Sequence, residues 1–274
     1  RGLQFLAFLT ALLRGMKAHG GLLRAGVAGP GNVHRLGGHE APPAIMSVFL
    51  GNALTRLLDD IEEGIPSTIA PRGDLDLGLF RLPALRTENT DRNRTAPVAF
   101  TGNKFEFRAP GASQSMSGPM TVLFALWARG MDIVMASMQQ SLDQGKDINE
   151  AALDAVRDVS RESRAVRFEG NCYAPEWAEE ARRRGLPVAH STPEALALYT
   201  TPENRELLCS LGIMTDREIF AYHDIRLHQF VTTADIEMDL LASMTREGVL
   251  PALSRQIALE GQSLGALPAA FAGG

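Results

Sequence analysis

The sequence has 274 residues, of which 45% are hydrophobic and 22% are charged, as is typical of a folded globular protein rather than a disordered chain. Its length suits one large domain or two small ones. The formal net charge of −5 makes nucleic acid and anionic membranes poor partners, because both are negatively charged. The two cysteines, Cys172 and Cys209, lie far apart without metal-type spacing, which indicates a reducing cytoplasm rather than a disulfide scaffold.

The first predicted element is a buried helix over residues 3–19, which we expect Gly20 and Gly21 to end. Its apolar run is shorter than the roughly 20 residues that span a bilayer, and Arg14 and Lys17 interrupt it. No small-residue cleavage site follows the run. The segment therefore predicts neither a membrane span nor a signal peptide.

Residues 29–43 are so rich in glycine and proline that they exclude a helix or a central strand. This predicted loop carries several charged or titratable side chains, namely His34, Arg35, His39 and Glu40. A loop with such groups is suited to close over a substrate and exclude water. The alternative is an ordinary connection whose charges are solvated.

The apolar segment Ala44–Leu50 predicts the start of a strand. Residues 52–63 then predict a helix that ends at Gly64, with acids on one side and apolar residues at helical spacing on the other: Leu54, Leu57, Leu58 and Ile61. From residue 65 to residue 90 the chain is rich in proline, glycine and aspartate. We expect a surface excursion there.

Residues 91–114 concentrate positive charge and read DRNRTAPVAFTGNKFEFRAPGASQ. Polar and apolar residues alternate near its end, so a strand would place Lys104, Glu106 and Arg108 on one face and turn two phenylalanines to the core. A carboxylate is a hard-oxygen ligand for Mg²⁺, and the flanking cations suit phosphate or carboxylate ligands. The alternative is a salt-bridged surface strand, since such ion pairs are common and individually weak.

The second half of the chain predicts an almost entirely helical structure. A helix opens at residues 117–119, with proline in its first turn, and apolar residues nearly encircle it, so we expect it to be buried. Later helices are marked by capping residues or prolines at their starts: Asp147, Pro175, Thr192, Thr201 and Thr215. Pro251 either kinks the last helix or begins a new one.

No chemistry is predicted in this helical half. His190, His223 and His228 are isolated from one another and suit core or surface positions better than catalysis. The run Arg182–Arg184 before Gly185 suits the C-terminus of a helix, where basic residues complement the dipole, better than a nucleic-acid patch.

Two ordered motifs, HRLGGHEAPPA at residues 34–44 and DRNRTAPVAFTGNKFEFR at residues 91–108, resemble the glutamine synthetase family. The wording RTAPVAFTGNKFEFRAPGASQS is similar to the long bacterial type III branch. The resemblance implies an α+β fold with antiparallel active-site strands and a large helical C-terminal half. Residues 1–116 would then form part of the catalytic domain with the lid loop and active-site strands, and residues 117–274 its helical C-terminal region.

The activity that the resemblance implies is ligation of ammonia to L-glutamate. ATP phosphorylates the γ-carboxylate, and ammonia displaces phosphate from the γ-glutamyl phosphate to give glutamine. The family uses Mg²⁺ or Mn²⁺ with ATP as co-substrate, works in the cytoplasm and forms homo-oligomers, with a double-ring dodecamer as the expected assembly. No nucleic-acid or membrane partner is expected.

Site roles carry over only at positions that match the motifs. Glu40 corresponds to a lid glutamate that assists ammonium deprotonation, and Arg94 to a catalytic arginine on the phosphates. Arg35 and Arg108 correspond to substrate-binding positions. Glu106 corresponds to a metal ligand. Arginine's fork suits carboxylate and phosphate, and a strand carboxylate suits the metal ion.

One position departs from the family pattern. Ala99 stands where the common branches have an arginine, which leaves a nucleotide contact unassigned. Lys104 is the candidate nucleotide- or phosphate-binding residue that compensates, with Arg92 as an alternative, although each is equally readable as a salt-bridge partner.

The chain starts at Arg1 rather than Met, and the acidic metal-binding strands of the family are expected upstream of it. We therefore expect a fragment that is inactive alone. Two alternatives remain: a γ-glutamyl-amine ligase, and a non-catalytic relative that serves as a structural oligomer. The role of residues 143–215 stays open between a branch-specific packing element and an inter-ring contact.

Overall fold

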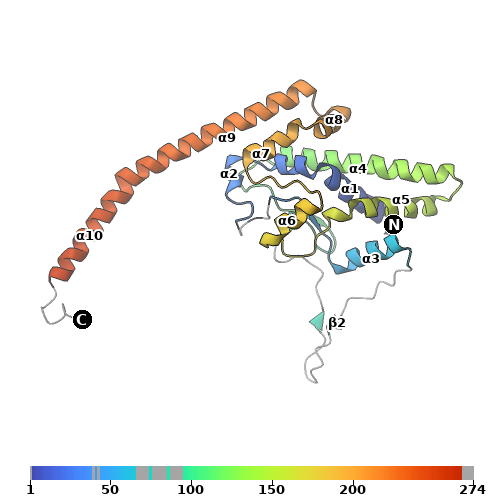
Figure 1. Cartoon of the computed structure of the whole chain (residues 1–274), viewed down its shortest axis with the longest axis horizontal. Helices are drawn as coiled ribbons and strands as arrows, with labels where there is room; N and C mark the ends of the chain where they lie inside the picture. The colour runs from blue at the N-terminus through green and yellow to red at the C-terminus, as the bar shows by residue number, and fades with distance from the viewer. Residues whose placement is uncertain are drawn as a thin grey trace, which may run out of the picture. The chain divides into compact units, whose positions relative to one another are not determined.

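In the computed structural model, the described residues are 2–38, 41, 44–65 and 95–266, together with the backbone of two short strands at 74–75 and 85–86 (Figure 1). The chain divides into two compact units, Arg1–Leu227 and His228–Gly274. The described part is mostly helical with a small mixed sheet. The predicted division at residue 116 stays a prediction.

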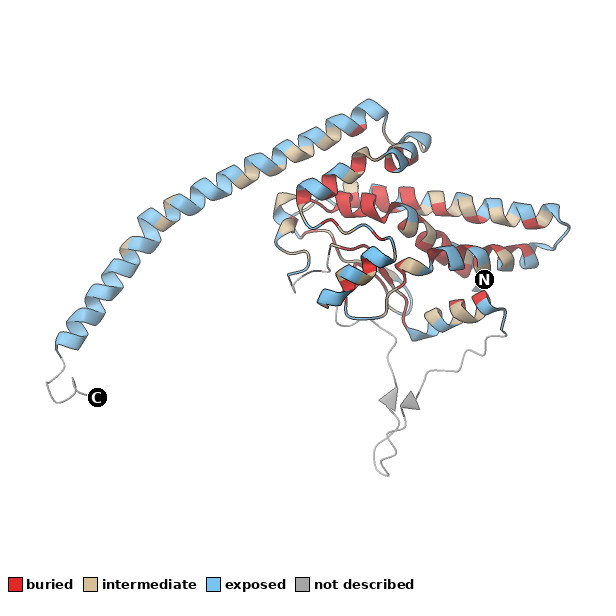
Figure 2. Cartoon of the chain, in the orientation of Figure 1, coloured by how far each residue is buried: buried red, intermediate tan, exposed pale blue. Residues whose placement is uncertain are grey.

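Three long helices form the centre of the first unit. α1 (Gly2–Gly26) packs along both α4 (Ser117–Asp143) and α5 (Ile148–Ser163), and buried leucine, valine and alanine side chains fill the space between them (Figures 1 and 2). Two glycines let α1 and α4 touch backbone to backbone. A Cβ on Gly130 would lie 1.9 Å from the carbonyl oxygen of Ala11, and one on Gly15 would lie 2.0 Å from that of Leu126.

The stop predicted at Gly20 and Gly21 is present as a kink at the neighbouring His19, where two helical segments join, and not as the end of the helix. α1 continues to Gly26, with one non-helical residue, His19, at φ −130° and ψ 20°. A Cβ on Gly21 would lie 3.2 Å from the ring of Pro187, so this glycine provides close packing rather than a helix stop. Tertiary packing of this buried stretch overrides the weak local preference of glycine against helix.

The prediction that α4 is buried holds for only part of its circumference. One face packs in the core, whereas Phe124 and Met135 are 57% and 54% exposed. By length and composition α4 is the one helix among the described residues that could cross a membrane, with a mean hydropathy of 1.3 over its best window. A core helix of a soluble protein passes the same test, and α4 packs against α1 and α5.

The sheet of the first unit has the order β1 (Val48–Phe49), β4 (Val98–Phe100), β5 (Phe105–Phe107). β4 and β5 pair antiparallel, with Ala99 opposite Glu106, and β1 joins β4 in parallel, so the sheet is mixed; that these are active-site strands stays a prediction. β2 (Asp74–Leu75) and β3 (Leu85–Arg86) pair antiparallel. The rest of the predicted surface excursion lies outside the described residues.

The helix predicted after β1 is confirmed as α3 (Asn52–Glu63), which ends at Gly64 with φ 74°. The predicted exclusion of helix from residues 29–43 is wrong at one point, because α2 (Pro30–Val33) forms a single turn there. Proline in the first turn presets a helical φ and lacks only an N–H that would be unpaired anyway, so a short helix tolerates it.

The remaining helices follow the predicted starts. The first unit contains α6 (Pro175–Arg183), α7 (Thr192–Ala197) and α8 (Pro202–Ser210), with 3₁₀ turns at Arg164–Val166 and Leu198–Thr200. The predicted capping box of α5 is present at Asp147 and Glu150. α9 (Asp216–Met244) begins after Thr215 as predicted, and a π turn, Thr245–Val249, leads into α10 (Leu250–Gly265) near Pro251.

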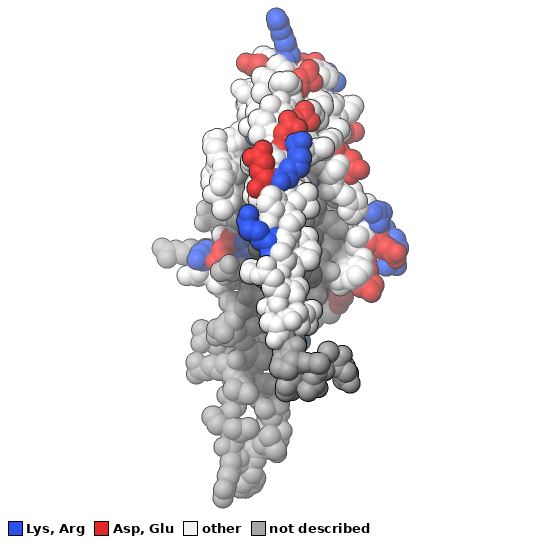
Figure 3. Space-filling model, turned by 90° about the vertical axis from the view of Figure 1, so that its left-hand side faces the viewer, with Lys and Arg blue, Asp and Glu red and all other residues white. Residues whose placement is uncertain are grey.

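The second unit, over its described residues 228–266, contains no buried side chain (Figure 2). Several large apolar side chains are exposed along it, including Ile236, Met238, Leu241, Ile257 and Leu264. Acidic and basic residues alternate over the face drawn in Figure 3, and the described residues there form no broad area of one sign.

Candidate active site

The charged strand face predicted from the sequence is present on β5. Lys104 Nζ lies 3.3 Å from Glu106 Oε1, and Arg108 Nη2 lies 3.1 Å from Glu106 Oε2. Phe105 and Phe107 pack against the core on the opposite face, as predicted. The three charged side chains thus form one cluster, which we name the β5 triad.

Exposure differs across the β5 triad. The Lys104 side chain is 64% exposed, that of Glu106 37% and that of Arg108 12%. Hydrogen bonds from Lys104 first, and then from Arg108, hold the pKa of the Glu106 carboxyl below its usual range. Glu106 is therefore ionised near neutral pH and still reachable from solvent.

The β5 triad contains one carboxylate of the kind that binds divalent cations. Glu106 can donate one oxygen ligand, and Mg²⁺ commonly uses one or two protein carboxylates with water and phosphate oxygens. No group of three His, Cys, Asp or Glu side chains able to hold a metal ion occurs within the described ranges. These residues fit one coordination position of a divalent cation but do not complete a site by themselves.

Arg35 lies beside the chain segment that follows β5. Its Nη1 donates to Asn32 Oδ1 at 2.8 Å and to the carbonyl oxygen of Pro110 at 3.4 Å. Pro110 is only two residues beyond Arg108. The structure therefore brings Arg35 to the segment that follows Arg108, more than seventy positions away; the resemblance implied substrate binding for both arginines.

Asn32 is a site residue that the sequence reasoning missed. It is 2% exposed, and its Nδ2 donates to the carbonyl oxygens of Val27 at 2.8 Å and Ala109 at 3.0 Å. An asparagine within a glycine- and proline-rich loop is usually a turn former, so the available signal favoured an ordinary turn role.

Gln114 fastens the same segment to the end of α1. Its Nε2 donates to the carbonyl oxygen of Gly26 at 3.0 Å, and its Oε1 accepts from the backbone N–H of Gly111 at 3.1 Å. Residues 109–114 are therefore held on the core from both ends. This frame fixes the place where Arg35 meets the end of β5.

Two predicted catalytic residues, Glu40 and Arg94, lie outside the described residues, as does Arg92. The chain flanking Glu40 is anchored, because Leu36 and Ala41 form a β-bridge and Tyr173 donates its hydroxyl to the carbonyl oxygen of Ala41 at 2.7 Å. The predicted roles of Glu40, Arg94 and Arg92 stay predictions.

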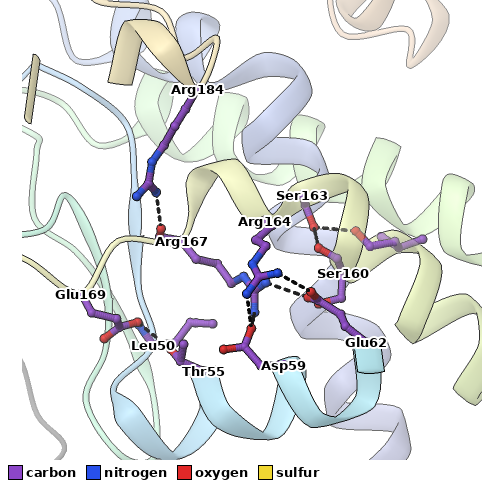
Figure 4. Close-up of polar contacts among 11 residues, drawn as sticks. Leu50, Thr55, Asp59, Glu62, Ser160, Ser163, Arg164, Arg167, Glu169 and Arg184 are labelled. Atoms are coloured by element: carbon purple, nitrogen blue, oxygen red, sulfur yellow. Dashed lines mark hydrogen bonds and ion pairs between the residues drawn. The ribbon is translucent and has the colours of Figure 1, made fainter. Parts of the chain in front are cut away.

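A second charged cluster, which the sequence reasoning did not predict, joins α3 to the segment after α5 (Figure 4). Arg167 Nη2 lies 2.6 Å from Glu62 Oε1, and Ser160 Oγ donates to the same oxygen at 2.6 Å. Arg167 Nη1 also lies 3.2 Å from Asp59, which Arg164 approaches at 3.4 Å. We name this group the Glu62 cluster.

The Glu62 cluster borders a cavity of about 440 Å³. Glu169, also on its wall, accepts hydrogen bonds from the backbone N–H groups of Leu50 and Gly51, just before α3, and from Thr55 Oγ1 within it. Arg184 donates to the carbonyl oxygens of Ala165 and Arg167. The polar groups around this cavity thus stabilise the junction of α3 with the core.

The histidines His190 and His223 of the helical half each contact one polar neighbour and not each other. His190 Nε2 lies 3.1 Å from Arg182, and His223 Nδ1 lies 2.9 Å from the neighbouring Asp224. Neither contact joins a nucleophile to a base. The β5 triad and Arg35 are the better candidates for chemistry.

An ionised carboxylate between two cations, with a further arginine held at the segment after it, can bind anionic groups and offer one oxygen to a cation. Comparison with known families identifies the class. Residues 151–260 match the model described as the glutamine synthetase C-terminal domain.

Three curated relatives extend this match over most of the chain. A glutamine synthetase of Bacteroides fragilis (strain YCH46) is 36% identical over 250 residues, which are 90% of this chain and 34% of the relative. A type-3 glutamine synthetase of Dictyostelium discoideum is 37% identical over 91% of the chain and 34% of the relative. A glutamine synthetase of Butyrivibrio fibrisolvens is 32% identical over 91% and 35%.

The chain is thus similar to glutamine synthetases over about 90% of its length, and its similarity to the type-3 relative agrees with the predicted branch. It spans about a third of the length of the curated relatives it matches.

Proposed function

We propose that the polypeptide containing this chain ligates ammonia to L-glutamate at the expense of ATP, through a γ-glutamyl phosphate intermediate. The observation that carries the proposal is the β5 triad with Arg35 beside it, in a chain related to glutamine synthetases over about 90% of its length. The fold alone would not support a specific activity, because folds host many functions.

The two arginines bind the substrate in this proposal. Arg35 is held by two neutral acceptors, so its positive charge is available to a carboxylate of glutamate. The Arg108 side chain is 12% exposed and is held against Glu106, so it offers a fixed donor rather than a flexible one. The arginine pair would orient glutamate with its γ-carboxylate towards the phosphate donor.

Glu106 and Lys104 act at the phosphate side of the proposed site. When bound, a Mg²⁺ or Mn²⁺ ion neutralises phosphate charge during transfer. Glu106 holds the negative charge that attracts this ion, and its lowered pKa keeps the carboxylate ionised. Lys104, more than half exposed, can leave Glu106 to bind a phosphate oxygen of ATP.

Glu40 and Arg94 complete the proposal. Glu40 would accept a proton from ammonium and, with the loop that carries it, exclude water from the acyl phosphate. Arg94 would bind the transferring phosphoryl group. We further propose that the protein is cytoplasmic, that it assembles into a homo-oligomer, and that residues 1–274 alone are inactive, because one carboxylate cannot hold the metal ions that the reaction needs.

The test is phosphate release by the full-length protein with ATP, Mg²⁺ and glutamate, to which ammonium or a small amine is added separately. Strict dependence on glutamate and ammonium supports the proposal. Faster release with the amine would instead indicate a γ-glutamyl-amine ligase. A folded oligomer that releases no phosphate with either would indicate a non-catalytic relative, and glutamine formation by residues 1–274 alone would contradict the proposed inactivity.

A further inference from the structure

We infer that Asn32 is a positioning residue that holds the Arg35 guanidinium in a fully charged, substrate-ready state. This inference rests on the proposed function, because it concerns the same glutamate-binding position. Asn32 lies in the second position after Pro30 and is almost fully buried, whereas Arg35 is only partly buried. The buried amide therefore anchors the more exposed cation.

The orientation of the Asn32 amide follows from its partners. Nδ2 has two hydrogens, and both are used by carbonyl oxygens, those of Val27 and Ala109. The opposite atom, Oδ1, must then face Arg35 and accept from Nη1 at 2.8 Å. Reversing the amide would set an N–H₂ group against the guanidinium and an oxygen against two carbonyls, so the hydrogen-bond network permits one orientation.

Gly111 leaves no spare room around this amide. A Cβ at position 111 would lie 3.3 Å from Asn32 Oδ1 and 3.4 Å from its Cγ. The carboxamide is thus confined by packing as well as by hydrogen bonds. Through Ala109 and Gly111, Asn32 ties Arg35 to the segment that leaves β5, so the position of Arg35 is coupled to that of the β5 triad.

The chemical character of the partners is the second part of the inference. Among the described residues no carboxylate pairs with Arg35, and both of its acceptors are neutral. Arg108 differs, because Glu106 offsets its charge. A guanidinium held by amide and peptide oxygens keeps its net charge for an incoming carboxylate, which makes it the stronger anion receptor of the two.

Asn32→Asp in the full-length protein tests this role, because the side chain keeps its shape but gains a charge. Its carboxylate would neutralise Arg35 and face two carbonyl oxygens. We expect the KM for glutamate to rise roughly 10- to 100-fold, as for loss of a charged hydrogen bond, with little change in the KM for ATP. In a double-mutant cycle, Asn32→Asp should add little to the defect of Arg35→Ala, because Asn32 acts through Arg35.

Asn204→Asp is the matched control, since Asn204 is another buried asparagine, hydrogen-bonded to His19 and Leu198 rather than to Arg35. It should lower stability without a selective rise in the KM for glutamate. If Asn32→Asp fails to fold, Gly111→Ala displaces the same amide more gently and should raise the KM for glutamate by a smaller factor.

Glutamate-induced stabilisation against heat provides a readout independent of turnover. Wild-type protein that neither turns over nor is stabilised by glutamate would overturn the proposed function and this role with it. If the wild-type protein is active but the KM for glutamate is unchanged in Asn32→Asp, the role of Asn32 is wrong while the proposed function stands. Where Asn32→Asp does not fold, an unchanged KM in Gly111→Ala has the same meaning. The role of Asn32 would also be wrong if the effects of Asn32→Asp and Arg35→Ala on the KM for glutamate were fully additive in the double variant.

Discussion

Two glutamates of this chain are each flanked by cationic side chains but lie in opposite surroundings. The Glu62 side chain is 4% exposed and contacts Arg167, which is equally buried, whereas the Glu106 side chain is 37% exposed and contacts Lys104 and Arg108. Removing a partner from the buried pair strands a charge in the core, but the exposed pair can exchange a partner for a ligand or water. Burial, and not the charge pattern, separates a structural cluster from a candidate site.

Glu62→Ala should produce the largest effect on stability. It removes the buried carboxylate of Arg167, which keeps the more exposed Asp59, and leaves Ser160 without its acceptor; losses of this kind are about 3–5 kcal/mol. Urea or thermal denaturation of the full-length protein measures the loss. A loss of stability below about 1 kcal/mol, which is common for surface ion pairs, would show that Glu62 and Glu106 do not differ in the way that their burial predicts.

A buried histidine extends the comparison to pH. Asn204 donates its Nδ2 to Leu198, so its Oδ1 accepts from His19 Nδ1, and burial, the larger influence, lowers the pKa of His19. The neutral ring therefore contributes stability that is fully present above the ordinary histidine pKa of about 6.5 and is lost as the pH falls towards the lowered value.

Thermal denaturation between pH 7.5 and pH 5 measures this effect. The wild-type protein should lose more stability over this range than His19→Gln, which cannot titrate at that position. Equal losses in the two proteins would show that His19 does not contribute to the pH dependence.

Arg164→Ala should have a smaller effect than Glu62→Ala, although both residues belong to the Glu62 cluster. The Arg164 side chain is 64% exposed and lies 3.7 Å from Glu62 and 3.4 Å from Asp59, so solvent screens both pairs. We expect a loss of less than about 1 kcal/mol in the same denaturation experiment. If Arg164→Ala lost as much stability as Glu62→Ala, the exposure of these ion pairs would not determine how much they stabilise the fold.

Parts of the fold were predictable because their signals are local. The alternation of Lys104, Glu106 and Arg108 predicted their common face, and the residues at Gly64 and Asp147 predicted helix ends. These features depend on neighbours within a few positions of the sequence. Backbone periodicity and capping therefore sufficed.

The features that the sequence did not predict depend on distant partners. Asn32 meets Ala109 across 77 positions, and Glu62 meets Arg167 across 105, so neither pairing has a local signature. Gly21 fits inside α1 only because Pro187 packs against it. In each case burial by a remote segment decides the role of the residue, and local propensity does not contain that information.

Glu106→Ala should have the smallest effect on stability and the largest on activity. The Glu106 side chain is 37% exposed, so water can replace its carboxylate beside Lys104 and Arg108, and the expected stability change lies within about 0.5 kcal/mol. Glutamine formation from ATP, glutamate and ammonium by the full-length variant, measured beside its thermal unfolding, tests the assignment of the β5 triad most directly. The account predicts a folded, assembled protein that has lost metal-dependent turnover, and turnover at the wild-type level would contradict it.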